Sequence, residues 1–154
     1  MIYSVGCEYA IRALVKIAGR GREGTFFLLR DIVEEDALPP HFVGKILQSL
    51  VRAGILVSAK GRGGGFALQR PASNIRLREV VNAIDGDSRL QRCILGYKTC
   101  DEFQTCPQHA QWVEIRAQID RLLDGTTLQD LLASGPKKQP APVGQFVGRR
   151  KLAP

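Results

Sequence analysis

Apolar residues recur every three or four positions along much of the chain, the spacing that places them on one face of a helix. This pattern predicts helices at about residues 4–19, 29–35, 40–53, 77–84, 110–123 and 128–132, with a turn at 36–38. The third helix is the best marked, because Pro39 and Pro40 are tolerated at a helix start and Gly54 stands where a left-handed cap belongs. Thr127 suits the N-cap of the last helix.

Two further segments, 55–59 and 65–68, favour β-strands, and Lys60-Gly61-Arg62-Gly63-Gly64 joins them. This arrangement predicts a hairpin with a basic, glycine-rich tip. Helix, turn, helix and basic hairpin is the order of a winged helix-turn-helix, whose third helix enters the major groove of DNA. A plain flexible loop is the other interpretation of the glycines. A nucleotide phosphate loop is disfavoured, because the run leads into a strand and no Gly-Lys-Ser/Thr follows.

The distribution of charge supports a polyanionic partner. The 154-residue chain has a net charge of +7, but residues 37–78 contain no Asp or Glu and seven basic side chains: Lys45, Arg52, Lys60, Arg62, Arg70, Arg76 and Arg78. The tail from Ser134 adds five more basic residues and no acid. A surface without carboxylates suits phosphate, although an ordinary solvated basic face has the same composition.

Candidate DNA contacts follow from this placement. Early exposed positions of the third helix, His41, Lys45 and Gln48, would contact bases, because Lys donates to guanine and Gln pairs with adenine. The remaining candidates would contact the backbone or the minor groove, and they are Arg52, Lys60, Arg62, Gly63 and Gly64.

A second chemistry is indicated by Cys93, Cys100, Cys106 and His109. Thiolates and imidazole bind zinc or iron-sulfur clusters, and three clustered cysteines do not suggest a disulfide framework. Their polar, aperiodic surroundings disfavour packed core thiols, whereas the remaining Cys7 is expected to be a packed side chain. Zinc and iron-sulfur remain equal alternatives on spacing alone.

Several segments together resemble one family of bacterial regulators. They are residues 6–10, 52–57, 61–66, 79–81, the three cysteines and Thr127-Leu128. The chain over about 1–132 resembles the IscR/NsrR branch of the Rrf-two transcription regulators. This resemblance implies a homodimer with crossing C-terminal helices, a palindromic operator in double-stranded DNA, and an iron-sulfur cluster in each subunit, with 2Fe-2S favoured and 4Fe-4S as the alternative.

The resemblance also bears on the fourth ligand and on DNA specificity. His109, three residues after the last cysteine, matches the cluster-assembly regulators, and we favour it. Glu8 matches the position of a carboxylate ligand in the nitric-oxide-sensing branch, supplied across the dimer. Gly44 departs from the glutamate of the cluster-assembly pattern, so the target sequence is not carried over.

The sequence therefore predicts a mostly α-helical protein with a small β-hairpin: a winged helix-turn-helix domain at 1–86, a cluster-binding loop at 87–109, a dimerisation helix region at 110–133 and a disordered basic tail at 134–154. We expect a cytoplasmic regulator that acts as a redox-sensing repressor, rather than an enzyme. No segment approaches the roughly 20 apolar residues that span a membrane, and no nucleophile or paired-carboxylate motif is found. A zinc-stapled DNA-binding or interaction protein is the alternative.

Overall fold

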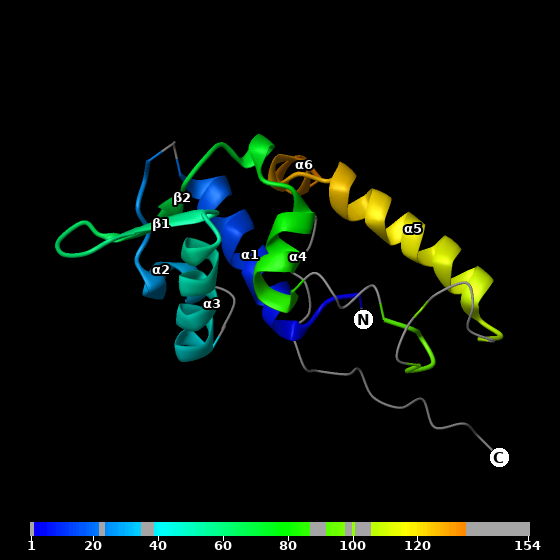
Figure 1. Cartoon of the computed structure of the whole chain (residues 1–154). Coiled ribbons are helices and arrows are strands. Elements are labelled where there is room, and N and C mark those ends of the chain that lie inside the picture. The colour runs from blue at the N-terminus through cyan, green and yellow to red at the C-terminus, as the bar shows by residue number, and fades with distance from the viewer. Residues whose placement is uncertain are drawn as a thin grey trace, which may run out of the picture.

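The computed structural model describes residues 2–21, 24–34, 39–86, 92–97, 100 and 106–134. Its elements, in chain order (Figure 1), are α1 (Val5–Arg20), α2 (Leu29–Val33), α3 (Pro40–Arg52), β1 (Leu56–Ala59), β2 (Gly65–Leu68), the 3-10 turn η1 (Ala72–Asn74), α4 (Leu77–Asp85), α5 (His109–Gly125) and α6 (Leu128–Ala133). The mostly helical prediction with one hairpin is confirmed. The predicted turn at 36–38 and the tail beyond Ser134 lie outside the described residues.

The helix ends follow from their local sequences. Ser4 caps α1 by accepting a hydrogen bond from the Cys7 N–H, and Thr127 caps α6 by accepting one from the Asp130 N–H. Gly54 follows α3 with a φ of 71°, a left-handed conformation that glycine adopts without a steric penalty. The two caps predicted from the sequence, Gly54 and Thr127, are therefore present.

One apolar core joins most of these elements. Leu14 of α1, Leu47 and Leu50 of α3, and Leu56 of β1 are almost completely buried in it. Leu128 of α6 belongs to the same cluster, so α6, which the sequence assigned to the dimerisation region, packs against the winged unit instead. We use "winged unit" for α1–α4, the hairpin and α6.

The hairpin pairs β1 with β2 in antiparallel register, Leu56 opposite Leu68 and Ala59 opposite Gly65. Phe27 forms an isolated antiparallel bridge with Phe66 of β2. The Phe27 N–H donates to the Phe66 carbonyl and the Phe66 N–H donates to the Phe27 carbonyl, both at 2.9 Å. A Cβ at Gly65 would lie 2.2 Å from the Phe27 carbonyl oxygen, so only glycine lets the two backbones approach this closely. The wing is thereby fixed to the segment before α2.

Helix α5 leaves the winged unit and extends away from it (Figure 1). It begins at His109, one residue earlier than predicted, so this histidine lies on the helix rather than in the preceding loop. Two backbone hydrogen bonds hold the end of α5 at the start of α4. The Leu77 N–H donates to the Thr126 carbonyl, and the Leu128 N–H donates to the Ile75 carbonyl. None of the described helices is both long and apolar enough to cross a membrane.

Candidate DNA-binding face and metal site

Helix α3 has one buried and one exposed face. Val43, Ile46, Leu47 and Leu50 are buried, which places the opposite side of the helix toward solvent. His41, Lys45, Gln48 and Arg52 are exposed on that side, and we call these four the recognition face. The apolar spacing of α3 thus positions all four residues that the sequence singled out in this helix.

The recognition face borders a shallow hollow between α2 and α3. All four of its residues line this hollow, together with Ser49 and the apolar Leu29, Pro40 and Gly44. Ser49 accepts a hydrogen bond of 2.8 Å from the Arg52 guanidinium and donates one to the Lys45 carbonyl. Arg52 is therefore held along the helix surface, with its charge beside the hollow.

The wing presents a second exposed basic element. Lys60, Arg62 and Gly63 are exposed at the tip of the hairpin, as the sequence predicted. Gly64 is instead buried, and a Cβ there would meet the Ala59 carbonyl oxygen at 2.3 Å. Its place is in the close turn of the hairpin rather than on the exposed tip.

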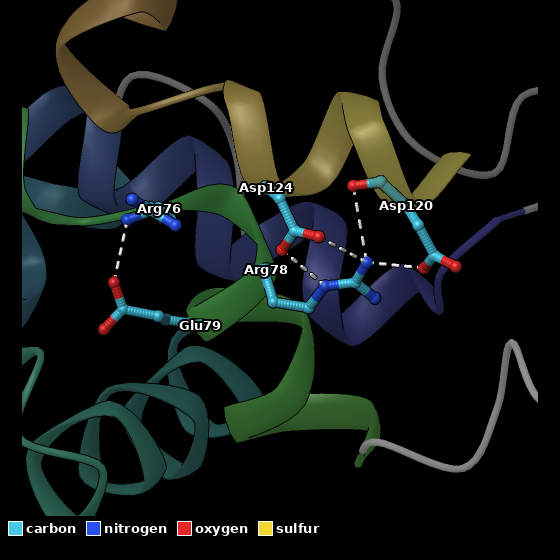
Figure 2. Close-up of polar contacts among 5 residues, drawn as sticks. All are labelled: Arg76, Arg78, Glu79, Asp120 and Asp124. Carbon is cyan, nitrogen blue, oxygen red and sulfur yellow. Dashed lines mark hydrogen bonds and ion pairs between the residues drawn. The ribbon is translucent and has the colours of Figure 1, made fainter. Parts of the chain in front are cut away.

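Two basic residues of the acid-free stretch are engaged by carboxylates from outside it. Arg70 pairs with Glu79, and Arg78 pairs with Asp120 at 2.5 Å and with Asp124 at 3.0 Å. In Figure 2 the Arg78 guanidinium lies between the two aspartates of α5. The stretch therefore carries less free positive charge than its composition suggested, and Arg78 serves instead to join α4 to α5.

The cysteines and His109 form two pairs. The Sγ atoms of Cys93 and Cys106 lie 3.8 Å apart, and Cys100 Sγ lies 3.7 Å from His109 Nδ1. Two thiolates on one tetrahedral metal are separated by about 3.8 Å when each metal–sulfur bond is about 2.3 Å. Each pair therefore has the spacing of two neighbouring ligands of one metal. Among the described residues no three His, Cys, Asp or Glu side chains converge into a single metal-binding group.

Backbone groups around Cys93 stabilise its thiolate. Burial raises the pKa of this thiol, but hydrogen bonds from the backbone N–H groups of Leu95 and Tyr97 outweigh burial and leave the pKa below its ordinary value. Burial raises the pKa of the Cys106 thiol, and the neighbouring Cys93 raises it further. Trp112 fixes the segment to α5 by donating its indole N–H to the Arg92 carbonyl at 3.0 Å.

Glu8 and Cys7 lie in the first turns of α1. Cys7 is fully buried against Leu77, Val81 and Leu123, as expected for a packed side chain. Glu8 is half-buried and does not join a cysteine pair to make a group of three. The start of α1 is held at the end of α4, because the Ser4 N–H and hydroxyl both donate to the carboxylate of Asp85.

Comparison with known proteins places this architecture in a family. A family model described as an iron-dependent transcriptional regulator, Rrf2, matches residues 3–134. An HTH-type transcriptional regulator from Aquifex aeolicus is 30% identical over 135 residues, covering 86% of this chain and 92% of that protein. IscR from Xenorhabdus nematophila is 30% identical over 125 residues, covering 81% and 75%.

A solved structure shares the fold. CymR of B. subtilis, described as the global cysteine regulator, superposes with a TM-score of 0.73 at 22% identity, covering 86% of this chain and 97% of that one. These relatives are transcriptional regulators and not enzymes, which confirms the expectation from the sequence. The chain belongs to the Rrf2 family of DNA-binding transcriptional regulators.

Proposed function

We propose that this regulator binds a palindromic operator as a homodimer in the cytoplasm, and that an iron-sulfur cluster held by Cys93, Cys100, Cys106 and His109 controls its DNA affinity as a redox-sensing repressor. The observation that carries the proposal is the pairing of these four side chains at 3.8 and 3.7 Å, in a chain that also presents an exposed basic face on α3.

The pairing favours a 2Fe-2S cluster over the alternatives. A mononuclear zinc site needs four ligands around one ion, whereas these residues form two pairs and no larger group. A 4Fe-4S cluster takes one protein ligand at each iron, so it does not require two ligands to lie in contact with each other. A 2Fe-2S cluster takes two ligands at each iron, so Cys93 with Cys106 and Cys100 with His109 supply a complete set. The bound cluster supplies a one-electron redox centre whose charge changes with oxidation state.

The fold of CymR does not decide this question, because the two chains are alike in fold at an identity of only 22%. The similarity to proteins named IscR supports the cluster more directly. His109 is preferred to Glu8 as the fourth ligand, because His109 is already paired with Cys100 within one chain. Glu8 would have to come from a partner subunit.

The dimer proposal rests on α5. Ile115 and Leu122 are 47% and 54% exposed, and their spacing of seven residues places them on one face of α5. A second copy of α5 would bury this face, and crossing helices would set the separation of the two recognition faces. DNA half-sites lie about one helical turn, 34–36 Å, apart, so a small change in this separation weakens binding.

Two contacts hold the elements on either side of the cysteine segment. Arg78 holds α5 at Asp120 and Asp124, about three and four turns from His109, and the Ser4–Asp85 bonds fix the end of α4, which precedes the cysteine segment in the chain. Ordering of the cysteine segment by the cluster would therefore favour one angle between α5 and the winged unit. This is a two-state element that a cluster and DNA can both bias.

Anaerobic purification tests the proposal. We expect visible absorbance with iron and inorganic sulfide in equal amounts, two of each per chain, and its loss in Cys93→Ala, Cys100→Ala and Cys106→Ala. The matched control is Cys7→Ala, which removes a buried thiol outside the pairs. If the protein instead contains stoichiometric zinc and no sulfide, the cluster proposal is wrong and the zinc-stapled alternative is supported.

His109→Ala and Glu8→Ala identify the fourth ligand. Loss or a shift of the absorbance in His109→Ala, with an unchanged spectrum in Glu8→Ala, is the expected result. The reverse result would assign the ligand to Glu8. Gel shifts with each preparation, before and after removal of the cluster with a chelator, then show which form binds DNA.

A further inference from the structure

Gly44 occupies the centre of the recognition face without a structural need for glycine. It lies three residues after His41 and four before Gln48, in the same stripe of α3. Its φ is not in the left-handed region, and a Cβ there would meet only Leu29 Cδ2, at 3.4 Å, an ordinary contact with the end of a flexible side chain. Because glycine weakens a helix interior, its presence here calls for an explanation outside the packing.

The missing side chain leaves an apolar notch among polar neighbours. Leu29 forms the floor beneath Gly44, Pro40 lines one side, and Lys45 and Gln48 border the same hollow. The floor cannot hydrogen-bond to a base edge. A group that enters this notch must therefore be small and apolar, and it must belong to a partner that the surrounding donors also bind.

We propose that the notch over Gly44 and Leu29 receives the 5-methyl group of a thymine in each half-site of the operator. In the major groove a T·A pair presents this methyl beside the acceptor O4 of thymine and the donor–acceptor edge of adenine. Lys45 supplies a donor for O4, and the Gln48 amide matches adenine. The inference rests on the proposed entry of α3 into the major groove and adds a base preference to it.

The test begins with the full-length protein and a pool of randomised duplex DNA. The protein, in whichever form binds DNA more tightly, cluster-loaded or cluster-free, is used to select a preferred DNA site from the pool. Each thymine of that site is then replaced singly by deoxyuridine, which differs from thymidine by the methyl group alone. At one position in each half-site we expect about fourfold weaker binding, and about fifteenfold weaker when both are replaced, from the free energy of burying one methyl group.

Gly44→Ala is the matched variant, because its methyl fills the notch while strengthening the helix. It should bind the thymine and deoxyuridine sites equally, whereas the wild-type protein prefers thymine. Lys45→Ala should weaken binding to both sites and leave the preference in place. Equal binding of the two sites by the wild-type protein at every position would overturn the proposal, as would an undiminished preference in Gly44→Ala.

The result also separates this inference from the function on which it rests. If Lys45→Ala and Gln48→Ala lose affinity but no thymine methyl is read, the recognition face stands and only the notch fails. If neither variant changes affinity or selectivity, α3 does not read the DNA, and both proposals fail together.

Discussion

Two helices of this molecule differ in how much of their apolar surface the chain itself covers. Helix α3, with 13 residues, buries Val43, Ile46, Leu47 and Leu50, whereas the 17-residue α5 buries Leu123 alone among its described residues. The first helix belongs to the main core, whereas the second follows the cysteine segment and buries little apolar surface. The winged unit is therefore stabilised by its own packing, while α5 is the helix on which the proposed dimer and cluster would act.

This difference would let one protein combine a rigid DNA-reading surface with the sensor that we propose. A tightly packed core resists deformation, so the recognition face keeps its shape. The proposed sensor would lie beside α5, where few apolar contacts oppose movement, and regions of low local stability are those that usually switch. The Arg78 contacts with Asp120 and Asp124 join the two regions and so carry any change from one to the other.

A matched pair of Leu→Ala substitutions gives the largest expected contrast. Leu50→Ala removes a fully buried side chain of the winged unit, and we expect it to lower the free energy of unfolding by about 2–5 kcal/mol. Leu122→Ala removes a side chain that is 54% exposed in one chain, so it should instead weaken dimerisation. Urea denaturation and analytical ultracentrifugation measure the two effects. Equal losses of stability with an unchanged dimer would show that α5 is not an interface.

Removal of one basic side chain from α3 or from α5 compares the contributions of the two helices to DNA affinity. Lys45→Ala should weaken operator binding about tenfold, because Lys45 is exposed on the recognition face and supplies a charged donor to the groove. Arg121→Ala, on the exposed surface of α5, should leave affinity and its salt dependence unchanged. Titrations by fluorescence anisotropy at several salt concentrations provide both values. A larger loss in Arg121→Ala would move the DNA surface to α5.

The same contrast determines what the sequence could predict. Apolar periodicity identified α1, α3 and α4 to within about two residues, because their faces pack in one core whose pattern is local. It did not show that Leu128 of α6 packs in the main core, because that contact joins residues far apart in the chain. It also included Arg70 and Arg78 in the charge of the acid-free stretch, although carboxylates outside that stretch engage both.

The candidate site shows the same limit. Spacing selected Cys93, Cys100, Cys106 and His109 as candidate ligands, but it did not pair them. The pairing depends on contacts between residues 92–100 and residues 106–112, such as the hydrogen bond from the Trp112 indole N–H to the Arg92 carbonyl. Gly44 stood out in the sequence as a departure from a family pattern, and only the Leu29 floor beneath it suggests a ligand.

Arg78→Ala tests the connection between the two regions. Its side chain is 19% exposed and its guanidinium binds two carboxylates of α5, so we expect a loss of about 1 kcal/mol in stability, at the upper end for a partly exposed ion pair. Arg30→Ala is the control, because Arg30 is 79% exposed in its contact with Asp31 and should contribute almost nothing. Faster hydrogen exchange in α5 should accompany the change in Arg78→Ala. If the two variants behave alike, the regions are joined by packing and backbone bonds rather than by Arg78.

The smallest expected effect is an acid dependence that reports on the same connection. A hydrogen bond from Arg78 holds the pKa of the Asp124 carboxyl below its ordinary value, and Thr127 does the same for Asp130 of α6. A depressed carboxyl pKa stabilises the fold above the unfolded-state pKa of about 3.9, and this stabilisation is lost as the pH falls through the folded-state value. Urea midpoints measured from about pH 6 to about pH 3 should therefore fall less steeply in Arg78→Ala than in the wild-type protein, because Asp124 then titrates near its ordinary pKa in both states.

Thr127→Ala is the control inside the winged unit. It should flatten the same pH dependence through Asp130, without faster hydrogen exchange in α5. An unchanged acid slope in Arg78→Ala would mean that Asp124 gains no stabilisation from Arg78 in solution, and the junction would then depend on Asp120 and the backbone bonds of residues 75–77 with 126–128.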